Sequence, residues 1–119
     1  MNTTKKRESK SIKEQKVPFY DLEMVRFLIK DGCGLDIAYA FEDLVFSEHG
    51  IFILQFVGES SQNLFCWFNK DCFENDRKTM FASLMKSAQL NGFELTYKGK
   101  FSMIQKENSE EIDLHFEKA

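Results

Sequence analysis

Cys72 is the side chain in this sequence that is best placed for covalent chemistry. Residues 71–74 follow the capping-box pattern D-x-x-E, which predicts a helix over residues 72–91 with Cys72 in its first turn. The positive end of a helix dipole lowers the pKa of a thiol in that position and raises its thiolate fraction.

A cysteine nucleophile also needs a base, and none is close to Cys72 in the sequence. His49 falls in a predicted turn, and His115 falls on the solvent-facing side of the last predicted strand. The negative charges of Asp71 and Glu74 oppose thiolate formation. We therefore expect an inert or partly buried thiol, assign no catalytic residue and predict that the protein is not an enzyme.

A metal site could in principle form from two cysteines and the two histidines, Cys66, Cys72, His49 and His115. The alternation of apolar residues places Cys66 in the core, whereas both histidines are predicted to be solvated. We therefore predict no metal ligands and no cofactor-binding residues.

The acidic residues Glu110, Glu111 and Asp113 cluster at a predicted turn. A loop that binds a hard cation needs more acidic residues at alternating positions, so these three are predicted to be solvated. The sequence also lacks the glycine-rich, zinc-protease and serine-nucleophile motifs GxGxxG, GxxxxGK[ST], HExxH and GxSxG.

Three aromatic residues, Phe65, Trp67 and Phe68, could stack on the bases of a single-stranded nucleic acid. Such a platform needs basic neighbours, and only Lys70 is close in the sequence. The sequence favours a place in the core for these rings, with Trp67 packed against one of the helices.

Composition indicates a single domain with a large aromatic core. The chain has 119 residues, of which 43% are hydrophobic and 13 are phenylalanine. Its apolar runs are too short to span a membrane, and its three cysteines lack paired spacing. We therefore expect reduced thiols and a soluble, cytoplasmic protein without a membrane partner.

Charge divides the chain into two parts. Residues 1–17 have net charge +4 and almost no large aliphatic residues, so a disordered basic tail is predicted there. Since the whole chain has net charge −3, the remaining domain, residues 18–119, is acidic. An acidic domain is a poor phosphate-binding surface, so nucleic acid could be bound only through the tail.

The centre of the predicted fold is a hairpin over residues 51–69, because its first strand is apolar on both faces. The apolar residues of 35–47 fit both the spacing of a helix and the alternation of a strand. A strand in their later half is favoured, and a helix over 35–47 stays an alternative. The other predicted elements are a helix at 19–31, the helix at 72–91, and strands at 93–98, 101–106 and 112–116.

These elements predict an α+β domain of order α-β-β-β-α-β-β-β, with an antiparallel sheet and helices packed on one face. The alternative order is α-α-β-β-α-β-β-β. At the level of topology, residues 19–106 resemble small acidic chaperones of the type III secretion class, which are homodimers. This chain departs from them, because its last predicted element is an amphipathic strand, whereas those chaperones usually end in a helix.

The sequence therefore predicts a non-catalytic protein-binding module, adaptor-like or chaperone-like, with a protein partner and a possible homodimer. Its apolar surface would lie on the sheet or at a sheet edge. The alternative function is a nucleic-acid-associated protein that uses its basic tail.

Overall fold

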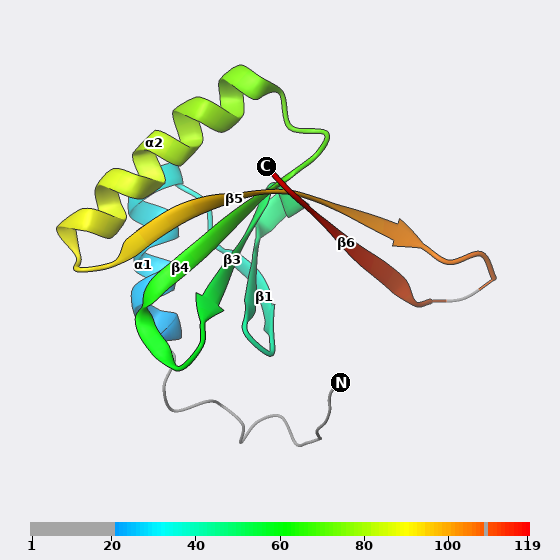
Figure 1. The fold of residues 1–119 in the computed structure, drawn as a ribbon, viewed down its shortest axis with the longest axis horizontal. Coiled ribbons are helices and arrows are strands. Elements are labelled where there is room, and N and C mark those ends of the chain that lie inside the picture. The colour runs from blue at the N-terminus through cyan, green and yellow to red at the C-terminus, as the bar shows by residue number, and fades with distance from the viewer. Residues whose placement is uncertain (1–20, 109) are drawn as a thin grey trace.

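A computed structural model describes residues 21–108 and 110–119, which form two α-helices and one six-stranded sheet. Both helices lie on one side of the sheet (Figure 1), so the α+β class is confirmed. The predicted tail, residues 1–17, lies outside the described residues. In chain order the elements are α1 (Leu22–Cys33), β1 (Ile37–Phe41), β2 (Leu44–Ser47), a 3₁₀ turn (Glu48–Gly50), β3 (Phe52–Val57), β4 (Ser60–Asn69), α2 (Glu74–Leu90), β5 (Glu94–Gln105) and β6 (Ile112–Lys118).

The sheet is mixed, which corrects the prediction of a wholly antiparallel one. Its strands are adjacent in sequence order, and neighbours are antiparallel except β4 and β5, which run parallel. The reason is the path of α2, which starts where β4 ends and returns the chain to the other end of the sheet. A parallel neighbour requires such a crossover connection.

Residues 35–47 form two strands, so the predicted helix alternative is wrong and four strands precede α2. Glu42 and Asp43 make a tight turn between β1 and β2, and Glu42 adopts a positive φ of 57°. The turn predicted around His49, over residues 47–50, is confirmed, since Gly50 has φ 62° where the 3₁₀ turn joins β2 to β3. The central hairpin is confirmed as well, because β3 and β4 occupy the two middle positions of the sheet.

The sequence predicted two strands, at 93–98 and 101–106, with a turn at Lys98, Gly99 and Lys100 between them. That turn is wrong, because these residues lie within the single long strand β5. The pairing of β4 with β5 shifts register there, from Cys66↔Tyr97 to Trp67↔Gly99. Gly99 has φ 149°, and the backbone of β6 passes so close that a Cβ atom would clash with the Glu117 carbonyl oxygen. The glycine therefore permits a bulge and a close approach of strands rather than a reversal.

Helix α1 starts later than predicted because Asp21 is its N-cap, accepting a hydrogen bond from the Met24 amide at 3.0 Å. Gly34, with φ 74°, ends the helix in the left-handed conformation. An ion pair of 2.8 Å between Arg26 and Asp36 connects α1 to the start of β1.

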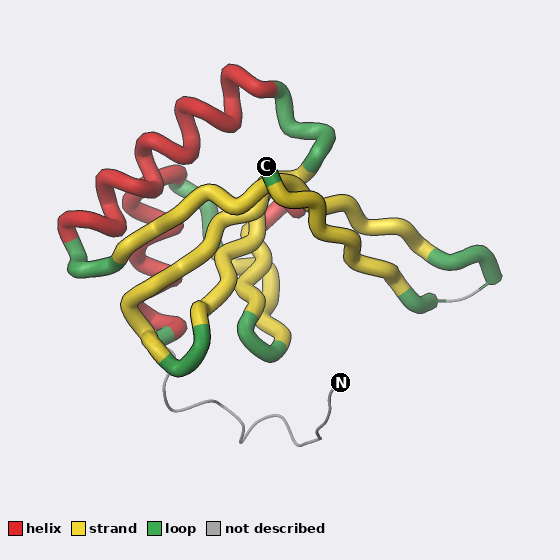
Figure 2. Tube along the Cα trace, in the orientation of Figure 1, coloured by secondary structure: helices red, strands yellow, loops and turns green. Residues whose placement is uncertain are grey.

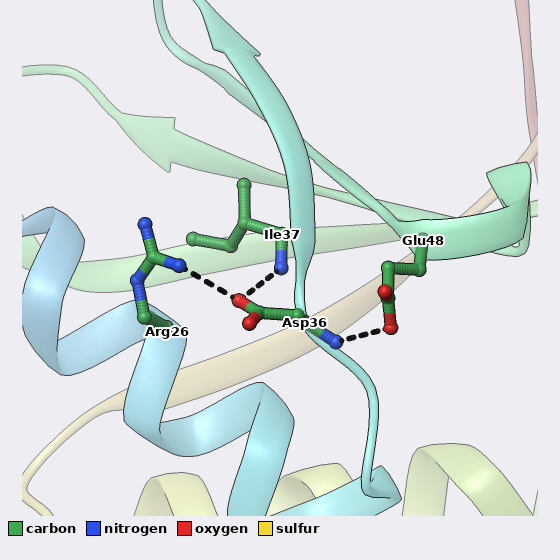
Figure 3. Close-up of polar contacts among 4 residues, drawn as sticks. All are labelled: Arg26, Asp36, Ile37 and Glu48. Atoms are coloured by element: carbon green, nitrogen blue, oxygen red, sulfur yellow. Dashed lines mark hydrogen bonds and ion pairs between the residues drawn. The ribbon is translucent and has the colours of Figure 1, made fainter.

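Figure 3 shows that the carboxylate and the backbone amide of Asp36 both make hydrogen bonds. Its carboxylate also accepts the Ile37 amide at 2.7 Å, and its own amide donates to the Glu48 carboxylate at 2.9 Å. The Ile37 hydrogen bond, followed by the charges of Arg26 and Lys30, lowers the pKa of the Asp36 carboxyl. These contacts fix the position of β1 relative to α1 and the 3₁₀ turn.

The main core lies between the helices and the sheet. Gly32 of α1 approaches α2 so closely that a Cβ atom would lie 3.2 Å from the Leu84 Cα. Beside this crossing the Ser87 hydroxyl donates to Asp31 at 2.9 Å. The large side chains buried in this core come from both helices, from the sheet and from the residue before β5: Leu28, Ile29, Phe52, Leu54, Phe56, Leu64, Phe68, Leu84, Phe93 and Leu95.

A second core lies on the opposite side of the sheet, which we call the open face. It is formed by Leu44, Phe46, Ile53, Trp67 and Phe101, with Leu114 packed against it. No helix of the described chain covers this side (Figure 1).

Trp67 is buried, as predicted, with an exposed fraction of 6%, but it packs on the open face rather than against a helix. Its ring lies 4.6 Å from that of Phe116 on β6. Its Nε1 donates to the Gln55 amide oxygen at 2.9 Å, and the Gln55 amide nitrogen donates to Asp43 at 3.0 Å. Strand β6 thus covers part of the second core, as the helices cover the main core.

The outer part of the β5–β6 hairpin, residues 102–105 and 112–115, pairs only with itself, and we call it the arm. Figure 2 shows the arm projecting beyond the other strands. Neither helix in the described part of the chain is long and apolar enough to cross a membrane.

Gly99→Ala should destabilise the protein by about 3 kcal/mol or more, because it adds backbone strain and a clash with β6. Gly92→Ala is the matched control, since Gly92 also has positive φ but has no atom within 4 Å of the added Cβ. The control should cost only about 1–2 kcal/mol. Urea unfolding of both variants measures the difference, and equal losses would contradict the close approach.

Trp67→Ala should cost about 3–5 kcal/mol through lost burial and a residual cavity. Trp67→Phe retains a ring in the second core, so it should cost less than the alanine variant while losing the hydrogen bond to Gln55. Chemical denaturation measures both. A native fluorescence maximum at the wavelength of free tryptophan would show that this indole is exposed.

Candidate functional site

A pocket of about 590 Å³ lies at one end of the sheet, between the two helices and the 3₁₀ turn. It brings together side chains that the sequence left apart, because Cys72, His49 and Cys33 all line it. Two acidic residues, Asp71 and Asp76, line it as well. This is the place in the described chain where thiol chemistry would have to occur.

Cys72 does not lie in a helix, which corrects the predicted capping box. Helix α2 begins at Glu74, with Phe73 as an N-cap that makes no side-chain cap hydrogen bond. Asn69 organises the preceding loop instead: its side-chain oxygen accepts the Asp71 amide and its carbonyl accepts the Cys72 amide, both at 2.9 Å. An asparagine turn thus replaces the expected aspartate cap.

The environment of Cys72 disfavours the thiolate. Burial, followed by the charge of Asp76, raises the pKa of the Cys72 thiol, and Arg77 acts in the opposite direction. The thiol donates a weak hydrogen bond of 3.7 Å to the Phe73 carbonyl rather than to the imidazole of His49. The pair is therefore not arranged as a nucleophile and its base.

The other two thiols are also held in the protonated form. Burial raises the pKa of the Cys33 thiol to about 11. Burial, followed by the proximity of Cys33, raises the pKa of Cys66, which is completely buried. A raised pKa lowers the fraction of thiolate, which is the form that acts as a nucleophile or as a metal ligand.

The four candidate metal ligands are not gathered at one place. His49 and Cys72 line the pocket, Cys66 is buried in the main core, and His115 is an exposed residue of the arm. Within residues 21–108 and 110–119 no three histidine, cysteine or acidic side chains are close enough together to hold a metal ion.

The acidic residues at the last turn interact with a lysine. Lys106 Nζ lies 3.4 Å from a carboxylate oxygen of Glu111 and 3.6 Å from one of Asp113. Glu110 is exposed. The ammonium group of Lys106 therefore partly neutralises this acidic cluster.

The three aromatic residues of β4 do not form a stacking platform. Phe68 is buried toward the helices and Trp67 toward the open face, as alternation along a strand requires. Phe65 is partly buried, and the Lys98 ammonium lies 4.5 Å from its ring. The core placement predicted for Trp67 and Phe68 is confirmed.

The open face carries a feature that the sequence did not reveal. Residues directly opposite each other in register share a face, so the pairs Tyr39↔Phe46 and Phe101↔Phe116 assign β1 and β6 to it. By this rule five of the exposed large apolar side chains lie on this face: Tyr39, Phe41, Met103, Ile112 and Phe116.

The other exposed large apolar residues are dispersed. Leu22 and Phe27 belong to α1, Phe73 and Leu90 flank or end α2, and Ile104 lies on the other side of the arm. The sequence shows the alternation of apolar and polar residues within each strand. It does not show which strands lie at the edges of the sheet. The sequence therefore gave no means to distinguish exposed Tyr39 from buried Phe46.

Comparison of the chain with protein-family models, with curated proteins and with solved structures finds no significant match. The resemblance in topology to secretion chaperones gains no support from these comparisons. The observed order, with four strands before α2, also differs from the order on which it rested.

Alkylation of Cys72 by iodoacetamide at pH 7 should be slower than that of a cysteine in an unstructured peptide, because its raised pKa lowers the thiolate fraction. Asp76→Asn removes one cause of the raised pKa and should accelerate the reaction. Asp71→Asn, on the same pocket, is the control and should change it less. Wild-type alkylation faster than the peptide would contradict this reading and support a reactive thiol.

Proposed function

We propose that this protein is a non-catalytic protein-binding module whose binding surface is the open face of the sheet. The observation that supports this is the concentration of exposed Tyr39, Phe41, Met103, Ile112 and Phe116 on one face. Solvent-exposed apolar groups gathered in this way are characteristic of surfaces that bind other proteins.

The size of the surface supports the proposal. Tyr39 and Phe41 are 53% and 57% exposed, and Phe116 is 40% exposed. With about 200 Å² for a large aromatic side chain, these three rings alone expose roughly 300 Å². This exposure is divided between the two edges of the sheet, with Tyr39 and Phe41 on β1 at one edge and Phe116 on β6 at the other.

The thiols support a non-catalytic role in a reducing compartment. All three cysteines are free, and each has a raised pKa. Free thiols are typical of cytoplasmic proteins, so a cytoplasmic location is part of this proposal.

Affinity capture from the native cell, quantified by mass spectrometry, tests the proposal. The variant Tyr39→Ser/Phe41→Ser changes two exposed residues and should remove the captured protein, since interface aromatics often contribute 2 kcal/mol or more to binding. The matched control is Phe73→Ser/Leu90→Ser, which removes two even more exposed apolar residues on the helix side. The control should capture the partner normally.

Thermal melting of both double variants shows whether each is still folded. A partner that is retained by the open-face variant and lost by the control would contradict the proposal. Capture of nucleic acid alone, abolished by deletion of residues 1–17, would favour the alternative function through the basic tail.

A further inference from the structure

We propose that the occupant of the open face is a second copy of this chain, in an isologous dimer. In this dimer the β1–β2 hairpin of one protomer packs against the arm and Phe116 of its partner, and the reverse contact occurs about the two-fold axis. The inference rests on the proposed function, because it identifies the partner of the same surface.

Two apolar patches on the open face would meet in this dimer. The first, at one edge of the sheet, consists of Tyr39 and Phe41 on β1. The second consists of Met103, Ile112 and Phe116 on β5 and β6, at the other edge. Both patches lie on the same face, so one two-fold axis can bring each patch against the other patch of the second copy.

The charges beside the patches select this arrangement. Glu42 and Asp43 form the turn that follows Phe41, so the first patch is bordered by negative charge. Lys118 lies two residues beyond Phe116 on the same strand face and pairs in register with Gly99, beside Lys98. Positive charge therefore borders the second patch at its Phe116 end, whereas Glu111 and Asp113 flank Ile112 at its other end.

Among the described residues, Glu42, Lys98 and Lys118 take part in no ion pair. Packing the first patch on the second, with Phe41 at the Phe116 end, places opposite charges together twice in the dimer. Packing the first patch on its own copy would instead oppose the like charges of Glu42 and Asp43, which is unfavourable. In the proposed orientation the open face is complementary to itself in charge as well as in apolar character.

The area of the two patches is close to what a dimer needs. Their five side chains are between 40% and 57% exposed. With about 200 Å² as an upper value for each complete side chain, they present at most roughly 500 Å² of mainly apolar surface. A standard interface buries about 800 Å² per partner, and about 65% of a homodimer interface is apolar, which corresponds to roughly 500 Å².

The arm supplies an independent reason for an occupant. Residues 102–105 of β5 hydrogen-bond in the sheet only to β6, so this part of the hairpin is a two-stranded ribbon. Isolated two-stranded ribbons are marginally stable in water, and this one exposes Met103 and Ile112 on one side. Contact with a second copy would bury those side chains and stabilise the ribbon.

Sedimentation equilibrium of the full-length chain, over a range of concentrations and at two salt concentrations, tests the dimer. The wild type should be a dimer, and Phe41→Ser and Ile112→Ser should each shift it toward monomer. Glu42→Lys should weaken association on the order of tenfold at low salt, because a reversed charge acts twice and is screened by salt. Lys118→Glu should act similarly.

The double variant Glu42→Lys/Lys118→Glu restores opposite charges and should recover most of the lost affinity. Lys86→Glu is the matched control, because Lys86 is an exposed residue of α2 on the helix side and should leave the dimer unchanged.

Charge variants that each weaken the dimer without rescue in the double variant would overturn the proposed packing. A wild type that is monomeric at all concentrations would overturn the second copy as the occupant. If that monomer still captures another protein through Tyr39 and Phe41, the proposed function stands and only this inference fails. If it captures none, both fail.

Discussion

The constraint on which this structure depends is the two-sided burial of the central strands. Phe52 and Leu54 point toward the helices, and Ile53 between them points to the open face; each is at most 1% exposed. A sheet whose middle strands are apolar on both faces needs a cover on both sides. The two helices provide one cover, and the other is built from the sheet itself.

The second cover depends on β5, which belongs to two parts of the fold. Its first half pairs with β4 and its second half with β6; residues 99–101 pair with both strands, and residues 102–105 pair with β6 alone. Gly99 lies where the two halves meet, and its lack of a side chain lets β6 return close enough to place Phe116 on Trp67. The projecting arm, with its exposed Met103 and Ile112, is a consequence of the same geometry.

The candidate chemical groups and the exposed apolar side chains are therefore separated in this molecule. The thiols and His49 lie on the helix side or in its core, in surroundings that keep the thiols protonated. The exposed apolar side chains gather on the open face, where Glu42 and Lys118 border opposite edges. This separation is the physical basis for a proposal of protein association rather than catalysis.

The sequence by itself determined the α+β class, the central hairpin and the extent of α2 to within two residues, because each depends on local periodicity and local stop signals. Only the tertiary structure decided the rest. Whether Gly99 reverses the chain depends on β6, which is distant from it until they pair. Whether Asp71 caps α2 depends on competition from Asn69. The exposure of Tyr39 beside buried Phe46 depends on which strand forms the sheet edge, and that is a property of the assembled sheet.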